Sequence, residues 1–349
     1  MKLKVYLWCG LILMLAFASC EKYNHIDNGS TVKVPYTLFI GGYHGTLHQT
    51  NDGLFYSTLF YTDNSIVRQV LVADTNICLL KRNFYCSKDD GKYFAPSNTG
   101  CILPIDSFKS YYFPNNAIYD FTDTNVYLVT RITGLEFSSD KGKTFTPVTN
   151  YAVGTTPPGP TDTVTSVTQM TNGDCFAMVD SQRYYKKTVG GAWTEVLADG
   201  TNDLPFNRPT ARWYVAHAHD TLIAIDFNGR YGVYYSTNLG TDWFACTGSG
   251  MPKTRKILFG NQAFGDDHFY VGYDSGGLFR MEAPATFTKV NTGIPWYAKI
   301  GYVEGKNITY RTNITKNILY CSTDLGLYWS KNGGRDWEIV HQGKYSTLK

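Results

Sequence analysis

The amino-acid sequence predicts an all-β fold, a seven-bladed β-propeller, and three observations lead to it. The 349 residues include 27 Tyr, 20 Phe, 7 Trp and 33 Gly, whereas charged residues make up only 17%. This composition favours strands joined by tight turns. No segment has a sustained 3.6-residue apolar periodicity with capping residues, so almost no helix is expected. The third observation, a turn motif that recurs along the chain, sets the number of sheets.

The start of the chain predicts a signal peptide and a tether. Lys2 and Lys4 precede an apolar run, and Cys20 follows the small residues Ala18 and Ser19. This order resembles the signal of a bacterial lipoprotein, in which the cysteine is lipidated and becomes the mature N-terminus. An ordinary signal peptide with an incidental cysteine is the alternative. The expected organisation is a lipoprotein signal peptide at 1–19, a lipidated cysteine with a flexible tether at 20–35, and the propeller at 36–349, anchored at the outer membrane of a Gram-negative cell envelope and facing the periplasm or the exterior.

The recurring turn is clearest near the C-terminus, where Ser330, Asn332, Gly334 and Trp337 have the spacing S-x-[DN]-x-G-x-x-[WF]. Alignment on the final aromatic residue gives seven units that recur about every 40 to 50 residues. Seven units of this length are what radial repetition of four-stranded sheets requires. The aligned aromatic residues are Phe55, Phe94, Phe145, Trp193, Trp243, Phe287 and Trp337.

Four of the seven turns match the spacing well. The Asp or Asn side chain can accept backbone N–H bonds within the turn, the glycine supplies an unusual φ, and the aromatic residue packs back between sheets. These residues are therefore expected to be structural. They are Ser87, Asp89, Gly91, Ser138, Asp140, Gly142, Ser236, Asn238, Gly240, Ser330, Asn332 and Gly334.

These four turns resemble the Asp-box, or BNR repeat, of sialidases, sortilin-type receptors, some glucanases and photosystem II assembly factors, all of which are β-propellers. The resemblance implies that each box joins the third and fourth strands of a blade on the face away from the functional site. A site is then expected on the opposite face, in the turns between the second and third strands and in the blade-to-blade connections.

That opposite face supplies the candidate site residues. The candidate catalytic carboxylates are Asp180, Asp226, Asp274 and Asp324. The candidate binding residues are His44, Arg82, Arg131, Arg183, Arg230, Trp213, Trp296 and Tyr297. Turns favour polar residues in any case, so an ordinary solvated turn is the alternative for each position.

A non-catalytic module that binds a glycan or a protein is the favoured function, with Trp213 and Trp296 stacking on sugar rings or anchoring a partner. A glycoside hydrolase that uses two turn carboxylates, about 6.5 to 9.5 Å apart if it inverts, is the alternative. A sialidase is disfavoured because the early F/Y-R-I-P motif is absent, and the strings around Arg68 and Arg208 depart from it. A third hypothesis is an assembly factor with an arginine-rich patch for a protein partner.

Charge and residue types exclude several partners. The net charge of +3 includes both signal-peptide lysines, so nucleic acid is not an expected partner. His217 and His219 share one face of a predicted inner strand, but no third ligand lies within reach by sequence. Neither a metal nor another cofactor is expected, and the chain is expected to be a monomer.

Two structural questions remain open from the sequence. The scattered cysteines favour buried free thiols, with a bridge involving Cys78, Cys86 or Cys101 as the alternative. The innermost strand of the first blade comes either from residues 31–34 or from Tyr345–Leu348, and the N-terminal segment is favoured. Beyond Cys9 and Cys20, the cysteines are Cys78, Cys86, Cys101, Cys175, Cys246 and Cys321.

Overall fold

The chain divides into two units, Met1–Thr37 and Leu38–Lys349. Met1–Thr37 lies outside the described residues, as do the predicted signal peptide, lipidation site and tether that fall in it. The computed structural model describes residues 38–50, 57–61, 65–73, 76–81, 84–89, 91–96, 117–119, 126–130, 134–140, 144, 146–148, 164–170, 172–179, 183–196, 204, 213–248, 250–252, 255–263, 268–283, 285–310 and 313–349. Within these ranges every regular element is a strand, and no helix is present that could cross a bilayer.

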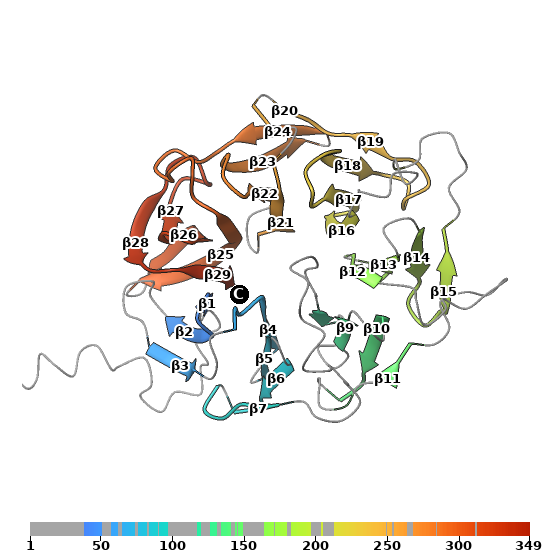
Figure 1. Cartoon of the computed structure of the whole chain (residues 1–349), viewed down its shortest axis with the longest axis horizontal. Helices are drawn as coiled ribbons and strands as arrows, with labels where there is room; N and C mark the ends of the chain where they lie inside the picture. The colour runs from blue at the N-terminus through green and yellow to red at the C-terminus, as the bar shows by residue number, and fades with distance from the viewer. Residues whose placement is uncertain are drawn as a thin grey trace, which may run out of the picture. The chain divides into compact units, whose positions relative to one another are not determined.

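The described strands form seven sheets, which are antiparallel apart from the pairing of β20 with β24 (Figure 1). The first contains β29 (Tyr345–Leu348), β1 (Leu38–Gly42), β2 (Thr46–Thr50) and β3 (Ser57–Tyr61). The second contains β4 (Gln69–Ala73), β5 (Asn76–Leu80), β6 (Phe84–Ser87) and β7 (Ala95–Pro96), and the third contains β8 (Ala117–Tyr119), β9 (Val126–Thr130), β10 (Gly134–Ser138) and β11 (Thr146–Pro147).

The remaining four sheets repeat this order from the innermost strand outwards. The fourth contains β12 (Val164–Gln169), β13 (Cys175–Val179), β14 (Arg183–Lys187) and β15 (Trp193–Glu195), and the fifth contains β16 (Trp213–Ala218), β17 (Thr221–Asp226), β18 (Val233–Ser236) and β19 (Phe244–Ala245). The sixth contains β21 (Ile257–Gln262), β22 (Phe269–Tyr273), β23 (Leu278–Ala283) and β24 (Thr286–Lys289), with the short parallel β20 (Thr247–Gly248) at its edge, and the seventh contains β25 (Ile300–Tyr310), β26 (Asn313–Thr323), β27 (Gly326–Ser330) and β28 (Glu338–Gln342).

The innermost strands contact one another in sequence. Contacts run from β29 to β4, β8, β12, β16, β21 and β25, and from β25 back to β29. Successive sheets joined in this way are the β-propeller arrangement. The prediction of an all-β propeller is therefore confirmed.

The first sheet is completed by the C-terminal strand. In β29, Leu348 pairs with Ile40 and Thr347 pairs with Gly41 of β1. The backbones of Phe39 and Lys349 exchange two further hydrogen bonds, at 2.7 and 3.0 Å. The favoured prediction, that residues 31–34 supply this strand, is wrong, because Tyr345–Leu348 occupies the position. Pairing the last strand with the first removes an open sheet edge.

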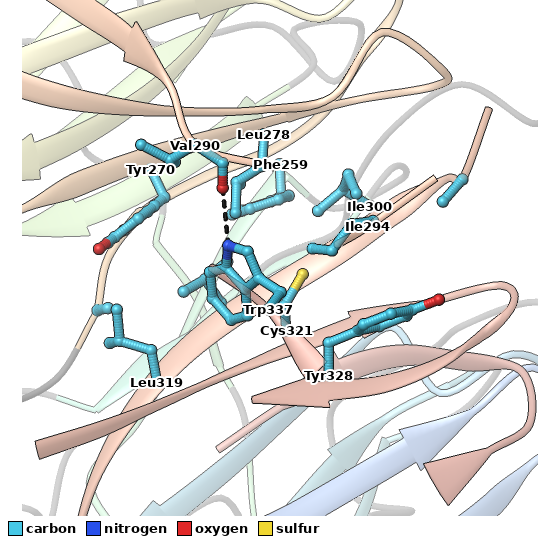
Figure 2. Packing of buried hydrophobic residues seen from close by; sticks show 13 residues of the cluster. Phe259, Tyr270, Leu278, Val290, Ile294, Ile300, Leu319, Cys321, Tyr328 and Trp337 are labelled. Carbon is cyan, nitrogen blue, oxygen red and sulfur yellow. Dashed lines mark hydrogen bonds between the residues drawn. The ribbon is translucent and has the colours of Figure 1, made fainter. Parts of the chain in front are cut away.

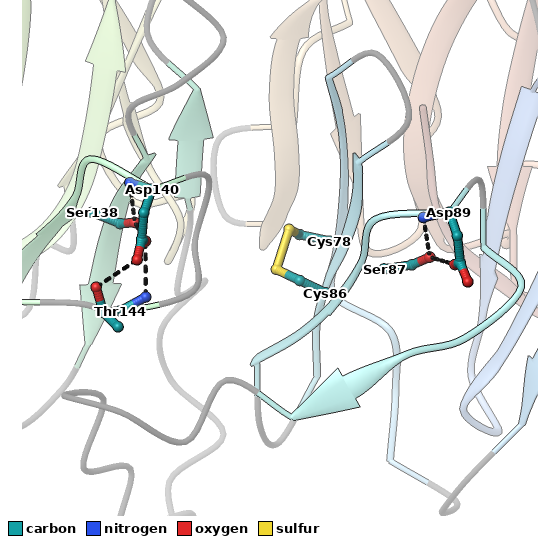
Figure 3. Close-up of a disulfide and its surroundings, with 7 residues drawn as sticks. All are labelled: Cys78, Cys86, Ser87, Asp89, Ser138, Asp140 and Thr144. Carbon is teal, nitrogen blue, oxygen red and sulfur yellow. Dashed lines mark hydrogen bonds between the residues drawn. A yellow bond between two sulfur atoms is a disulfide. The ribbon is translucent and has the colours of Figure 1, made fainter.

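Four turns share one hydrogen-bond pattern, and each lies between the third and fourth strands of its sheet. We call them the serine turns; they begin at Ser87, Ser138, Ser236 and Ser330. In each, the buried serine Oγ donates to the Asp or Asn Oδ1 two residues on, at 2.7 to 2.9 Å. The same Oδ1 accepts the backbone N–H four residues later, at 2.9 to 3.0 Å. Figure 3 shows two of these turns.

The glycine of the serine turn supplies a left-handed backbone. Gly91, Gly240 and Gly334 have φ between +81° and +88°, a region that favours glycine. Each donates its N–H to the serine Oγ at 2.8 to 2.9 Å. The serine hydroxyl thus accepts the N–H of the glycine and donates to the Asp or Asn side chain. Gly142 lies outside the described residues.

The aromatic residue after the turn packs against the preceding sheet. Trp337 is 3% exposed, and its Nε1 donates to the Val290 carbonyl at 2.7 Å (Figure 2). Trp243 donates in the same way to the Tyr184 hydroxyl, at 3.2 Å. These contacts fix the packing of one sheet on the next. Phe94, Trp193 and Phe287 are also buried, whereas Phe55 and Phe145 lie outside the described residues.

Two cysteines form a disulfide, which corrects the preference for free thiols. Cys78 of β5 lies directly opposite Cys86 of β6, and their sulfur atoms are bonded (Figure 3). Cys246 and Cys321 keep free thiols. Burial raises the pKa of the Cys246 thiol to about 12 and that of the Cys321 thiol further. Cys101 lies outside the described residues.

Candidate ligand-binding site

The antiparallel order of the sheets gives the folded unit two distinct faces. The serine turns lie at one end of the strands, which we call the serine-turn face. The turns between second and third strands, and the connections to the next sheet, lie at the other end, which we call the connection face. The topology therefore places the described candidate residues of the turns and connections on the connection face, as the sequence predicts.

Two exposed aromatic side chains lie together on the connection face. Trp296 is 64% exposed and Tyr297 is 56% exposed; their rings are perpendicular, with centroids 5.8 Å apart. Both belong to the connection between β24 and β25. Buried Ile294 and Ala298 anchor this connection on either side, and the Trp296 carbonyl accepts the N–H of Gly276 at 2.8 Å. A fixed backbone thus presents two large aromatic rings to solvent.

A lysine between two carboxylates lies beside the aromatic pair. The Lys299 Nζ is 3.6 Å from Asp274 Oδ1, and the backbone N–H of Lys299 donates to Asp324 Oδ1 at 2.9 Å. Asp274 follows β22 and Asp324 follows β26, so two neighbouring sheets contribute the carboxylates. The two carboxylates and the Lys299 ammonium can offer hydrogen-bond acceptors and donors to a ligand.

The first sheet also reaches this region through Tyr43. Burial raises the pKa of the Tyr43 hydroxyl above its usual value, and the negative charges of Asp324 and Asp274 raise it further. The phenol therefore stays protonated and can donate a hydrogen bond near neutral pH. We call these residues the connection-face cluster: Tyr43, Asp274, Trp296, Tyr297, Lys299 and Asp324.

Exposed basic residues also lie on the connection face. Arg255 donates from Nη1 to the Ser275 hydroxyl at 2.7 Å, one residue from Asp274. Lys344 follows β28, and its carbonyl accepts the N–H of Tyr43 at 3.1 Å. The described connection face thus carries more exposed basic than acidic residues. Its exposed basic residues are Arg68, Arg230, Arg255, Lys256, Lys299 and Lys344.

Asp226 has a different environment from the other two described carboxylates. It is completely buried at the end of β17. Its carboxylate accepts the backbone N–H groups of Asn228, Arg230 and Tyr231, at 3.0 to 3.1 Å. Such bonds stabilise the turn between β17 and β18. We assign Asp226 to turn structure rather than to the exposed surface.

The structure corrects one predicted binding residue and leaves others outside its range. Trp213 is completely buried in β16, so the prediction that it stacks on a ligand is wrong. His44 and Arg230 are exposed in their predicted turns. Arg183 begins β14, but its side chain is not described. The predicted residues outside the described ranges are Arg82, Arg131 and Asp180.

Sequence reasoning missed Tyr43 and Lys299. Both lie next to residues that it selected, His44 and Trp296, but neither belongs to the recurring motif. Their place in the site depends on the approach of three different sheets, and no local sequence pattern indicates that approach. The sequence did show a basic residue, Lys299, two positions after the aromatic pair, which could have marked it as a candidate.

The histidine pair lies away from the cluster, near the serine-turn ends of the innermost strands. His217 Nδ1 is 2.8 Å from the Thr168 hydroxyl of the neighbouring sheet. Burial, and then the charge of His219, lowers the pKa of His217 to about 4. Among the described residues, no group of three or more His, Cys, Asp or Glu side chains could hold a metal ion.

Comparisons with known proteins support the fold. No protein-family model matches the chain, and no curated protein matches its sequence. YCF48 bound to a D1 peptide has a TM-score of 0.52 at 11% identity, covering 81% of this chain and 85% of that chain. YCF48 from Cyanidioschyzon merolae has a TM-score of 0.54 at 16% identity, covering 80% and 87%. An ancestral GH74 enzyme has a TM-score of 0.51 at 15% identity, covering 79% of this chain but 38% of that enzyme. At these identities the likeness shows a shared β-propeller fold alone.

Proposed function

We propose that this chain is a lipid-anchored binding protein of the cell envelope and that its ligand site is the connection-face cluster. The ligand is a glycan or a protein. The observation that carries the proposal is the exposure of Trp296 and Tyr297 on a connection whose neighbouring residues are buried. Large exposed aromatic residues in a fixed geometry are the usual anchors of protein interfaces and of sugar rings.

The charged residues of the cluster complete the proposed site. Asp274, Lys299 and Asp324 offer carboxylate oxygens and an ammonium within one small region. Such groups orient a ligand by hydrogen bonds after an aromatic residue has supplied contact area. YCF48, which shares the fold, binds a D1 peptide, and this supports a protein ligand for a propeller of this kind.

We also propose that each of the seven sheets is one blade and that the serine turns are Asp-boxes. Support comes from their common hydrogen bonds and from their position between the third and fourth strands. If the serine turns are Asp-boxes, their residues stabilise the turns of the serine-turn face. The ligand would then bind at the connection face.

An array that displays both glycans and peptides tests the binding function. The purified chain is expected to retain a defined subset of probes without releasing product from them. Binding to no probe on either array would count against the proposal. Mass spectrometry of the mature protein tests the anchor separately: an acylated Cys20 is expected, and a mature N-terminus at another residue would contradict it.

A glycoside hydrolase is the second candidate. Asp274 and Asp324 flank Lys299 on neighbouring sheets, and an ancestral GH74 enzyme shares the propeller fold. Release of reducing sugar from an array glycan, lost in both Asp274→Asn and Asp324→Asn, would favour this function. Release that persists in both variants would remove these carboxylates from the mechanism.

A further inference from the structure

A two-stranded ribbon extends past the seventh sheet. β25 and β26 have 11 residues each, whereas β26 pairs with β27 only from Leu319 to Ser322. Beyond this stretch the β25–β26 pairing continues from Lys306 and Ile318 to Tyr310 and Asn313. Among the described strands no third strand pairs with this part. At about 3.3 Å per residue, it extends the hairpin by roughly 16 Å.

The ribbon leaves the serine-turn face. Leu319 of β26 pairs with Ser330, where a serine turn begins, and the ribbon continues from that level. The corresponding hairpin of the fifth sheet is much shorter. There Leu222 pairs with the turn residue Ser236, and the β16–β17 pairing ends one residue later, at Thr221. The ribbon therefore continues well beyond the level at which the fifth-sheet hairpin ends.

The ribbon sequence has a single sign of charge. Between Lys306 and Ile318 the chain carries lysine and arginine but no aspartate or glutamate, together with isoleucines and a tyrosine. Basic residues near a bilayer are attracted to anionic headgroups, and tyrosine is enriched at the membrane–water interface. This composition fits an anionic lipid surface.

The chain enters the folded unit at the same face. Leu38 begins β1 opposite Thr50, the last residue of β2, and the turn after β2 connects third and fourth strands. Leu38 is thus at the serine-turn end of its sheet. A chain of 18 residues, the separation between Cys20 and Leu38, spans at most about 60 Å. The proposed lipid on Cys20 therefore holds Leu38 within that distance of the bilayer, which the ribbon can also reach.

We propose that the ribbon formed by Lys306–Tyr310 and Asn313–Ile318 contacts the anionic headgroups of the membrane. The serine-turn face then points toward the bilayer and the connection-face cluster points away from it. The orientation of the two faces relative to the bilayer rests on the proposed lipid anchor. Headgroup binding by the ribbon does not depend on that anchor.

Vesicle sedimentation of the mature chain 20–349 carrying Cys20→Ala, which has neither the apolar segment of the predicted signal peptide nor a lipid, tests the ribbon alone. The probes are vesicles of phosphatidylcholine mixed with phosphatidylglycerol, and vesicles of phosphatidylcholine. The protein is expected to bind the mixed vesicles, and less strongly as salt is raised. The double variant Lys306→Glu/Lys316→Glu is expected to lower the partition coefficient at least about tenfold.

The matched control is Arg255→Glu/Lys256→Glu, which makes the same charge change on the connection face. It is expected to change the partition coefficient less than about twofold.

Unchanged vesicle binding by the ribbon variant, or an equal loss in the control, would overturn the proposal. Binding to polyglutamate without binding to vesicles would overturn it in favour of an acidic polypeptide partner. If the charge-reversing variant has a lower melting temperature, the neutral variant Lys306→Gln/Lys316→Gln replaces it. This variant is expected to lower the partition coefficient at least about threefold, and an unchanged partition coefficient would overturn the proposal.

Discussion

The serine of each serine turn satisfies two partners at once. Ser330 accepts the N–H of Gly334 at 2.9 Å and donates to Asn332 at 2.9 Å, while its side chain is 1% exposed. A buried N–H without an acceptor costs about 1 to 3 kcal/mol. These bonds are local in sequence, and this explains why the turns could be predicted from residue spacing.

Ser330→Ala is expected to lower the free energy of unfolding by about 1 to 3 kcal/mol, because the Gly334 N–H loses its acceptor. Urea denaturation measures the change. Ser139→Ala, at an exposed position of another serine turn, is the control and is expected to stay within about 0.5 kcal/mol. Equal effects of the two substitutions would contradict the structural role of the buried hydroxyl.

His217 predicts an acid dependence of stability. Its pKa is about 4 in the folded protein, against 6.5 for an ordinary histidine, so the unfolded chain binds more protons between these values. Stability is therefore expected to fall as pH decreases from 6.5 to 4, by about 3 kcal/mol in all from this group. His217→Gln should flatten this part of the profile, whereas exposed His44→Gln should not. A profile unchanged by His217→Gln would refute the assignment.

At the scale of strands and sheets, the sequence predicted what depends on local pattern. Third strands that end in serine turns lie where the motif places them. Ring closure by Tyr345–Leu348 was not predicted, because both ends of the chain offer short extended segments and only long-range pairing decides between them. Trp213 was assigned to a connection because strand boundaries are poorly marked, and the structure places it in β16 instead.

Deletion of Tyr345–Lys349 is expected to lower the free energy of unfolding by about 3 to 6 kcal/mol, because Tyr345 and Leu348 lose their buried positions. Thermal and urea unfolding both measure this effect. Deletion of residues 21–35 removes the alternative segment and is expected to change stability by less than about 1 kcal/mol. The reverse order of effects would show that the N-terminal segment closes the ring.

At the scale of the whole molecule, the two faces of the ring carry different features. The serine-turn face carries structural turns, the entry of the chain and the extended ribbon. The connection face brings Tyr43, Asp274 and Trp296 together from different parts of the chain. A rigid ring that presents its loops at one end is a common basis for ligand binding. The sequence predicts a site on this face, and this stays a prediction; the approach of Tyr43, Asp274 and Trp296 could not be predicted because it depends on the packing of several sheets.

The most direct test is the affinity of the strongest array ligand for two variants of similar chemistry. Trp296→Ala removes an aromatic ring that is 64% exposed on the connection face, and Tyr93→Ala removes one that is 71% exposed on a serine turn. Calorimetry is expected to show at least about a tenfold loss of affinity for Trp296→Ala and less than about a twofold change for Tyr93→Ala. Full affinity in Trp296→Ala, with a loss of affinity in Tyr93→Ala, would place the ligand site on the serine-turn face and contradict a site on the connection face.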